Sequence, residues 1–173
     1  MSSQKYGWTE EKIARYVKDG RGQGELSNYK PWLTIQDVPS KGRSHRVMGW
    51  KTNRIHHLLS DMEFDYLCIL DWVSNVLDIR EQYPLDRIST LKISEELEVK
   101  HPTDLKTGTP IVMTTDFLIT LREGNKIVHL ARTIKPSEQL NDERIIQSLK
   151  SREYIGRNKV LIGELLQRKN FCR

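Results

Sequence analysis

The sequence predicts one mixed α/β domain, and three segments carry that prediction. An amphipathic helix begins near Ser60, a strand runs from Val76 to about Arg80, and two segments rich in β-branched residues are joined by the turn REGNK. The chain has 173 residues, of which 37% are hydrophobic and 29% charged. A chain of this length can bury one core without disulfide or metal staples.

The N-terminal segment WTEEKIARYVKDG predicts a first helix. Thr9 stands at the N-cap position, and an apolar stripe follows it at Ile13, Tyr16 and Val17. The glycines of GRGQG then end the helix. No strand precedes this motif, so a flexible turn is favoured over a dinucleotide-binding loop.

A long irregular and basic segment is expected next, from Asn28 to Asn53. Between Lys41 and His57 the chain holds five strong cations and no acid. The net charge of +5 permits a polyanionic partner without requiring one. Two interpretations stay open for this segment, a solvated loop or contact with phosphates. Trp50 either stacks on a base or covers the core, and a helix-start or phosphate-facing role is favoured over zinc for His56 and His57.

The helix near Ser60 places a carboxylate on its apolar face. At 100° per residue, Glu63 falls in the middle of a stripe formed by Leu59, Met62, Tyr66, Leu67, Leu70 and Val73. An unpaired charge is expensive to bury. Glu63 therefore either pairs with a structural Arg or Lys, or it faces a metal or catalytic centre.

The C-terminal half predicts a hairpin followed by a helix. Val112 to Leu121 and Ile127 to Lys135 are the expected paired strands, with Pro136 ending the second. SEELEV suggests a helical turn, Ser137 caps a predicted helix SEQLNDERIIQSLKSREYI, and Lys159–Gly163 suggests a last strand.

These elements predict a metal-dependent site. The hairpin brings the strand of Asp116 beside the strand that ends in Lys135, and Glu63 joins them if its helix packs on that face. Two carboxylates ~4 Å apart repel by roughly 4 kcal/mol at an effective dielectric constant near 20, and a divalent cation removes this repulsion. Oxygen ligands suit Mg²⁺, and such a site can hydrolyse a phosphodiester.

The sequence also resembles the TnsA family, the endonuclease subunits of heteromeric bacterial transposases. The resemblance spans about Ile13 to Arg144. Its motifs, in order, are GRGQG, YKPWLTIQDVPSKGRSHR, RIHHLLSDME, VLDIREQYPL, KHP, TTDFL, IKP and DER.

The resemblance implies a restriction-endonuclease-like α/β fold with a mixed central sheet flanked by helices. It also implies Mg²⁺-dependent cleavage of the 5′ strands at transposon ends, which frees the non-transferred strands. The implied partners are double-stranded DNA, the integrase-type transposase subunit TnsB and the AAA+ ATPase regulator TnsC. Some relatives belong to CRISPR-associated transposons.

Carried over residue by residue, the resemblance implies Glu63, Asp116 and Lys135 as catalytic residues. Glu63, Asp116 and Thr133 are the implied metal ligands, although Thr133 stands where relatives have Gln, Glu or Asp. The hydroxyl is a weaker ligand than a carboxylate, and the Ile134 carbonyl is an alternative. The expected DNA-binding residues are Lys41, Arg43, His45, Arg46, Lys51 and Arg54.

The expected organisation has two parts. Residues 1–58 form an N-terminal helix and basic region packed on the nuclease core, and residues 59–173 form the catalytic core. The family's C-terminal ATPase-binding domain is expected to be absent, which weakens the expectation of direct TnsC binding. Two cysteines and no long apolar run indicate a soluble intracellular protein without a membrane span, and the resemblance implies the bacterial cytoplasm.

Two alternatives to the transposase nuclease remain open. In one, Thr133 marks a degenerate site and the protein is a DNA-binding assembly subunit. In the other, the chain is a stand-alone restriction enzyme that cuts both strands without a partner.

Overall fold

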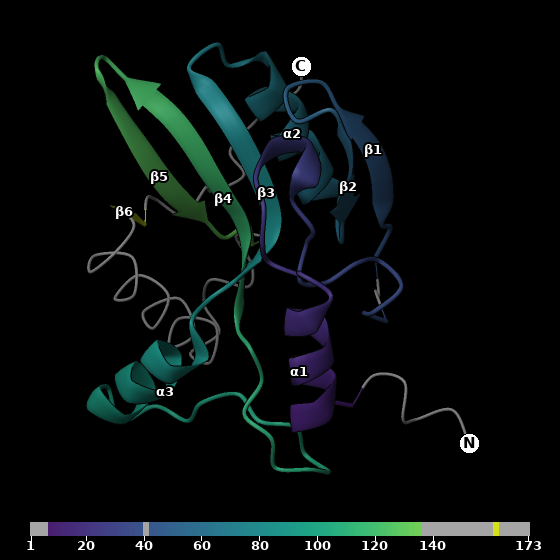
Figure 1. Ribbon diagram of the computed structural model, residues 1–173, viewed down its shortest axis with the longest axis vertical. Coiled ribbons are helices and arrows are strands. Elements are labelled where there is room, and N and C mark those ends of the chain that lie inside the picture. Colours follow the sequence, from purple (N-terminus) through teal and green to yellow (C-terminus); the bar gives the residue numbers. More distant parts are fainter. Residues whose placement is uncertain (1–6, 40–41, 136–160, 163–173) are drawn as a thin grey trace.

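A computed structural model describes residues 7–39, 42–135 and 161–162 (Figure 1). A four-stranded sheet has the order β3-β4-β5-β6, with β3 at Val76–Pro84, β4 at Thr114–Glu123, β5 at Lys126–Arg132 and β6 at Leu161–Ile162. β3, β4 and β5 are antiparallel, whereas β6 is parallel to β5. The mixed α/β prediction is therefore confirmed.

The turn between β4 and β5 forms as predicted. Glu123 pairs with Lys126, and Gly124 between them has a φ of 58°. Glycine adopts this left-handed conformation without steric cost, which suits a tight hairpin.

The helix α2 (Asp61–Trp72) packs its apolar side on the sheet. The main core is formed by the buried side chains Leu58, Leu67, Leu70, Val76, Ile79, Phe117, Ile119 and Ile134. Tyr66 meets the fully buried Phe117 edge to face at 5.5 Å between ring centroids. This packing fixes the start of α2 next to the middle of the sheet.

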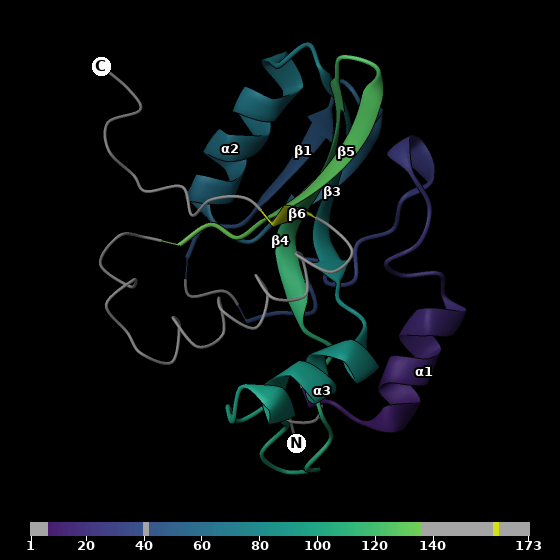
Figure 2. The ribbon, with the colours of Figure 1, turned by 90° about the vertical axis from the view of Figure 1, so that its left-hand side faces the viewer.

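A second cluster lies around α1 (Glu10–Lys18). Thr9 caps this helix as predicted, because its hydroxyl accepts a hydrogen bond from the Lys12 N–H at 3.2 Å. Tyr16 and Trp32 are buried there, and Trp8 stacks on Trp32 at 6.3 Å. Figure 2 shows α1 and α3 (Arg87–Glu96) at the end of the molecule away from α2.

Several boundaries differ from the prediction. The expected loop Asn28–Asn53 contains the strand β1 (His45–Gly49), and its first residue is the last residue of η1 (Leu26–Asn28). The pair His56 and His57 lies in the strand β2 (Arg54–Leu58), which pairs with β1, and not at a helix start. Pairing with β1 makes this segment a strand. Helical periodicity in the sequence cannot reveal such pairing between segments.

Other differences lie further along the chain. The strand β3 continues to Pro84, and a full helix α3 forms where only a turn was expected. The strand β5 ends at Arg132, so Thr133 and Lys135 lie just beyond it. The predicted helix from Ser137 lies outside the described residues, whereas β6 falls inside the predicted strand Lys159–Gly163. In the described part of the chain, no helix has the length and apolar character needed to cross a membrane.

Candidate active site

Glu63 is held by the first turn of α2. The Ser60 hydroxyl accepts a hydrogen bond from the Glu63 N–H at 3.2 Å and donates one to Glu63 Oε1 at 3.1 Å. The Leu59 N–H donates to Glu63 Oε2 at 2.9 Å. This arrangement is a variant of the capping box, in which the Glu63 carboxylate binds the Ser60 hydroxyl and the N–H of Leu59, one residue before the N-cap. Helix capping therefore points the carboxylate in a defined direction.

Asp116 is held by the chain that leaves β5. The Ile134 N–H donates to Asp116 Oδ2 at 2.7 Å, and Lys135 Nζ lies 3.9 Å from the same oxygen. The Asp116 side chain is buried, and the Lys135 side chain is about one-third exposed. The ammonium group is thus beside the carboxylate and still open to solvent or a ligand.

The electrostatics connect Glu63 to both of these groups. Burial raises the pKa of Glu63 to about 7, and the nearby charge of Asp116 raises it as well. The hydrogen bonds from Leu59 and Ser60 and the charge of Lys135 act in the opposite direction. A carboxyl group beside a second carboxylate in a desolvated place is the arrangement that a divalent cation relieves.

The donor set fits Mg²⁺. Glu63 and Asp116 supply carboxylate oxygens, and the contacts of Asp116 with described residues use only Oδ2. Nowhere in the described ranges do three or more His, Cys, Asp or Glu side chains gather into a metal cluster. Magnesium sites commonly have one or two carboxylates, with water and substrate phosphates completing the coordination.

The structure does not bring Thr133 to this pair through any contact recorded among the described residues. Its hydroxyl lies 3.4 Å from the hydroxyl of Thr115, which neighbours Asp116 along β4. The extended alternation that predicted a shared face for Thr133 and Lys135 assumed a strand, whereas β5 has already ended at Arg132.

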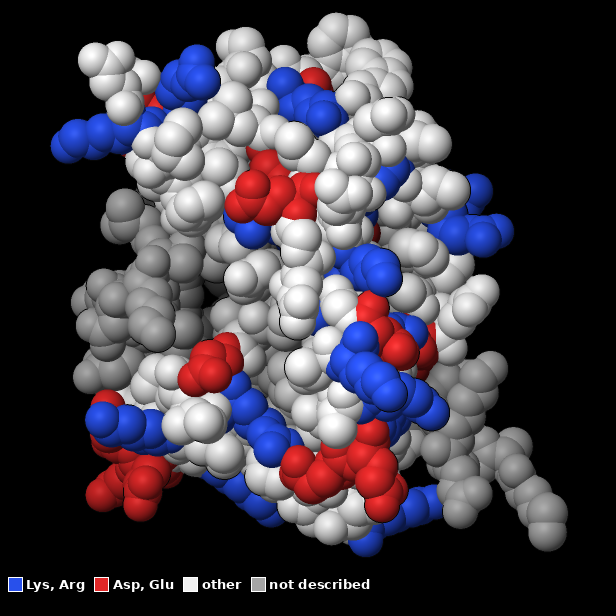
Figure 3. Space-filling view, viewed as in Figure 1, with Lys and Arg blue, Asp and Glu red and all other residues white. Residues whose placement is uncertain are grey.

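The predicted DNA-binding residues differ in their exposure and contacts. Arg43 and Arg46 are exposed and Lys51 is partly exposed, whereas Lys41 lies outside the described residues. His45 Nε2 lies 2.6 Å from Asp61 Oδ1. On the face in Figure 3, Lys and Arg side chains alternate with Asp and Glu and do not form one uniform patch.

Arg54 was predicted to bind DNA, but the structure buries it. Its guanidinium group is buried and binds both carboxylate oxygens of Glu81, with Nη1 at 2.8 Å from Oε1, and donates to the Ile79 carbonyl at 2.8 Å. The prediction treated Arg54 as part of an exposed loop, but alternation along β2 turns it inward.

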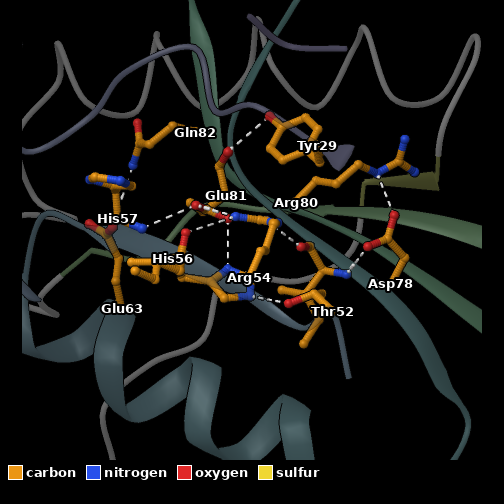
Figure 4. A network of polar contacts seen from close by, with 12 residues as sticks. Tyr29, Thr52, Arg54, His56, His57, Glu63, Asp78, Arg80, Glu81 and Gln82 are labelled. Carbon is orange, nitrogen blue, oxygen red and sulfur yellow. Dashed lines mark hydrogen bonds and ion pairs between the residues drawn. The ribbon is translucent and has the colours of Figure 1, made fainter. Parts of the chain in front are cut away.

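Arg54 belongs to a buried polar network centred on Glu81 (Figure 4). His56 Nδ1 lies 2.7 Å from Glu81 Oε2, and His56 Nε2 lies 2.7 Å from the Thr52 hydroxyl. Burial alone would raise the pKa of Glu81, but hydrogen bonds from Arg54 and His56 lower it to about 2. Glu81 therefore has a structural role, and His56 shares it, because its buried side chain has no exposed face for phosphate.

Sequence reasoning missed Gln82. This buried residue of β3 donates from Nε2 to Glu63 Oε2 at 3.4 Å. Its φ of 46° is left-handed, a conformation that costs a non-glycine residue about 1–3 kcal/mol. No pattern in the sequence marks such a backbone, because it arises from contacts with distant segments.

Trp50 does not cover the core. Its side chain is 72% exposed and meets the exposed Trp72 at 5.6 Å between ring centroids. The Asp71 carboxylate accepts hydrogen bonds from the N–H groups of Trp50 and Lys51, which ties the turn after β1 to the end of α2.

Comparisons with known proteins agree with the family resemblance. Residues 73–160, just over half of the chain, match the family model described as TnsA-like endonuclease N terminal. The chain is 46% identical over 149 residues to the transposon Tn7 transposition protein TnsA of Escherichia coli. That match covers 86% of this chain and 54% of the relative, so the chain spans about half the length of the curated relative it matches.

Proposed function

Because the chain belongs to the TnsA family, we propose that this domain is the Mg²⁺-dependent endonuclease of a transposase. Its proposed reaction is hydrolysis of the 5′, non-transferred strands at transposon ends during cut-and-paste transposition. The observation that supports the proposal is that Lys135 Nζ lies 3.9 Å from Asp116 Oδ2, and that the charges of both groups act on the buried Glu63. A restriction-endonuclease-like arrangement of sheet and helices is part of this proposal.

Each of the three side chains has a proposed role. Asp116 and Glu63 would hold Mg²⁺, which when bound lowers the pKa of water and neutralises charge at the scissile phosphate. The ammonium group of Lys135, kept near Asp116 and partly open to solvent, would stabilise negative charge that develops on the phosphate. The Ile134 N–H holds Asp116 through Oδ2, which orients Oδ1 for a ligand.

The proposed DNA contact uses the cations that remain accessible. Arg43, Arg46 and Lys51 carry charge along the β1–β2 region, and Lys41 precedes them in the sequence. Phosphate contacts by such residues position a duplex without reading its sequence. His45 is also part of the proposed contact surface, and its Nε2 lies 2.6 Å from the Asp61 carboxylate at the start of α2.

The proposed partners are double-stranded DNA, the integrase-type subunit TnsB and the ATPase regulator TnsC. We infer these partners from membership of the TnsA family. The similar protein of Escherichia coli is named as a transposition protein. TnsB would supply cleavage and joining of the complementary strands.

The direct experiment is a strand-nicking assay on transposon-end DNA with the partner subunits and Mg²⁺. Asp116→Asn should lower 5′-strand cleavage by at least about 100-fold, because the isosteric amide keeps the shape but removes a charged ligand. Glu63→Gln should lose activity for the same reason.

Asp65→Asn is the matched control, since Asp65 is an exposed carboxylate of the same helix and should leave cleavage unchanged. Full 5′-strand cleavage by Asp116→Asn would contradict the enzyme proposal and favour an assembly subunit. Double-strand cleavage without partners would favour a stand-alone restriction enzyme.

A further inference from the structure

Gln82 has an unusual backbone at a central position of the sheet. Its neighbours Glu81 and Tyr83 pair with Phe117 and Thr115 of β4, so Gln82 lies across from Asp116. A left-handed non-glycine residue inside a strand interrupts regular pairing, and such outliers concentrate at functional sites.

Two hydrogen bonds from the N-terminal segment hold this backbone in place. The Tyr29 hydroxyl donates to the Glu81 carbonyl at 3.0 Å, and the Trp32 N–H donates to the Gln82 carbonyl at 3.2 Å. Both aromatic residues are buried. The left-handed conformation is therefore imposed by distant parts of the fold and not by local sequence.

The side chain of Gln82 is directed to the candidate active site. Its amide group bridges two elements, with Nε2 donating to Glu63 Oε2 and Oε1 accepting from the Thr114 hydroxyl, each at 3.4 Å. Figure 4 shows the amide extending from β3 to the Glu63 carboxylate. Both distances are long for hydrogen bonds, so the amide restrains the carboxylate loosely.

We propose that Gln82 is a positioning residue, which orients the Glu63 carboxylate towards Asp116 for metal binding. The left-handed backbone turns the amide to that place. This inference rests on the proposed function, because it requires that Glu63 and Asp116 bind a divalent cation. Residues that orient metal ligands in this way typically change metal affinity or activity by about 10- to 100-fold when they are replaced.

The test uses two replacements that remove the amide in different ways. Gln82→Gly also relieves the left-handed backbone, whereas Gln82→Met keeps most of the side-chain volume. Binding of Mn²⁺ to the full chain without DNA is measured from the free Mn²⁺ signal in electron paramagnetic resonance, with Asp116→Asn as the blank. Both variants should bind Mn²⁺ at least about 10-fold more weakly.

A second readout separates positioning from a structural role. In the nicking assay, the half-saturating Mg²⁺ concentration should rise by the same factor while KM for DNA stays unchanged. The melting temperature of Gln82→Gly should equal or exceed that of the wild type.

Glu98→Gly is the matched control. Glu98 is an exposed left-handed residue after α3, so this change relieves comparable backbone strain and should leave Mn²⁺ binding unchanged.

The proposal is overturned if both Gln82 variants bind Mn²⁺ as the wild type does, or if both fail to fold. If instead the wild type binds no more Mn²⁺ than Asp116→Asn and does not nick DNA, the proposed function itself fails.

Discussion

Glu63 serves the helix and the candidate site with the same carboxylate. Its bonds to Ser60 and Leu59 satisfy the start of α2 and fix the direction of the side chain. Ordinary capping glutamates are exposed, but this one is buried near Asp116. Burial and the charge of Asp116 therefore raise its pKa to about 7, and a divalent cation bound there would displace the proton.

This raised pKa predicts a stability that depends on pH. Because the folded pKa of about 7 lies above the ordinary value of 4.5, metal-free protein should be most stable below pH 4.5 with respect to this group. Its contribution of about 3 kcal/mol should be lost as the pH rises to about 7. Denaturant unfolding of the wild type and Glu63→Gln between pH 4.5 and 8 measures it.

In that experiment the Glu63→Gln curve should lack this decline, and saturating Mg²⁺ should reduce it in the wild type. Parallel curves for the two proteins would contradict the assignment.

At the scale of single residues, the sequence predicts three side chains of the candidate site but not the fourth. The apolar stripe shows Glu63 on the inner face of a helix, and the spacing of the hairpin brings Asp116 beside Lys135. Gln82 was missed because its backbone depends on Tyr29 and Trp32, which lie about 50 residues away in the sequence.

The strands β2 and β3 are joined by the buried ion pair of Arg54 and Glu81. This pair connects the hairpin β1–β2 to the central sheet, and the Glu81 carboxylate also accepts a hydrogen bond from the His57 N–H at 3.1 Å. A buried pair of this kind contributes little over apolar residues of the same shape, but the loss of one partner leaves a charge uncompensated.

Arg54→Met should therefore destabilise the protein by about 3–5 kcal/mol, measured by urea unfolding. The double replacement Arg54→Met with Glu81→Met should restore much of that loss. Lys92→Met is the control, because the exposed pair of Lys92 with Glu96 on α3 contributes no more than about 0.5 kcal/mol. Equal small effects for Arg54→Met and Lys92→Met would contradict the assigned role.

The wrong prediction for Arg54 has a cause at the scale of elements. Sequence periodicity does not show which way the side chains of these short strands point. A cluster of cations predicts phosphate contact only if the side chains point outward. The short strands β1 and β2 contain polar and apolar residues on both faces, so the sequence gives no clear alternation to separate Arg46 from Arg54. Only the pairing of the two strands decides it.

At the scale of the whole molecule, the net charge of +5 is small, and the face seen in Figure 3 carries both signs. Strong nonspecific attraction to DNA is therefore not expected. Under the proposed function, DNA binding should depend on a few phosphate contacts and on the proposed partner subunits.

The salt dependence of DNA binding tests this. If Lys41, Arg43, Arg46 and Lys51 each contact a phosphate, the slope of log affinity against log salt concentration should be about −3.6. Replacing Arg43 or Arg46 by Ala should reduce its magnitude by about 0.9 each, as measured by fluorescence anisotropy.

Arg122→Ala is the control, because Arg122 is exposed on the β4–β5 hairpin, away from these cations in the sequence and in the fold. A wild-type slope near zero, or equal slopes for all variants, would rule out the proposed contacts.

The bond from the Ile134 N–H to Asp116 has a consequence for mutagenesis. The carboxylate is the anchor for the residue that directly precedes Lys135, so truncating Asp116 releases the tether of its own neighbour. Asp116→Ala would therefore remove one functional group and displace another. The losses of activity from Asp116→Ala and from a replacement of Lys135 should not be additive in free energy. The positions of the aspartate and the lysine are therefore linked through the Ile134 backbone.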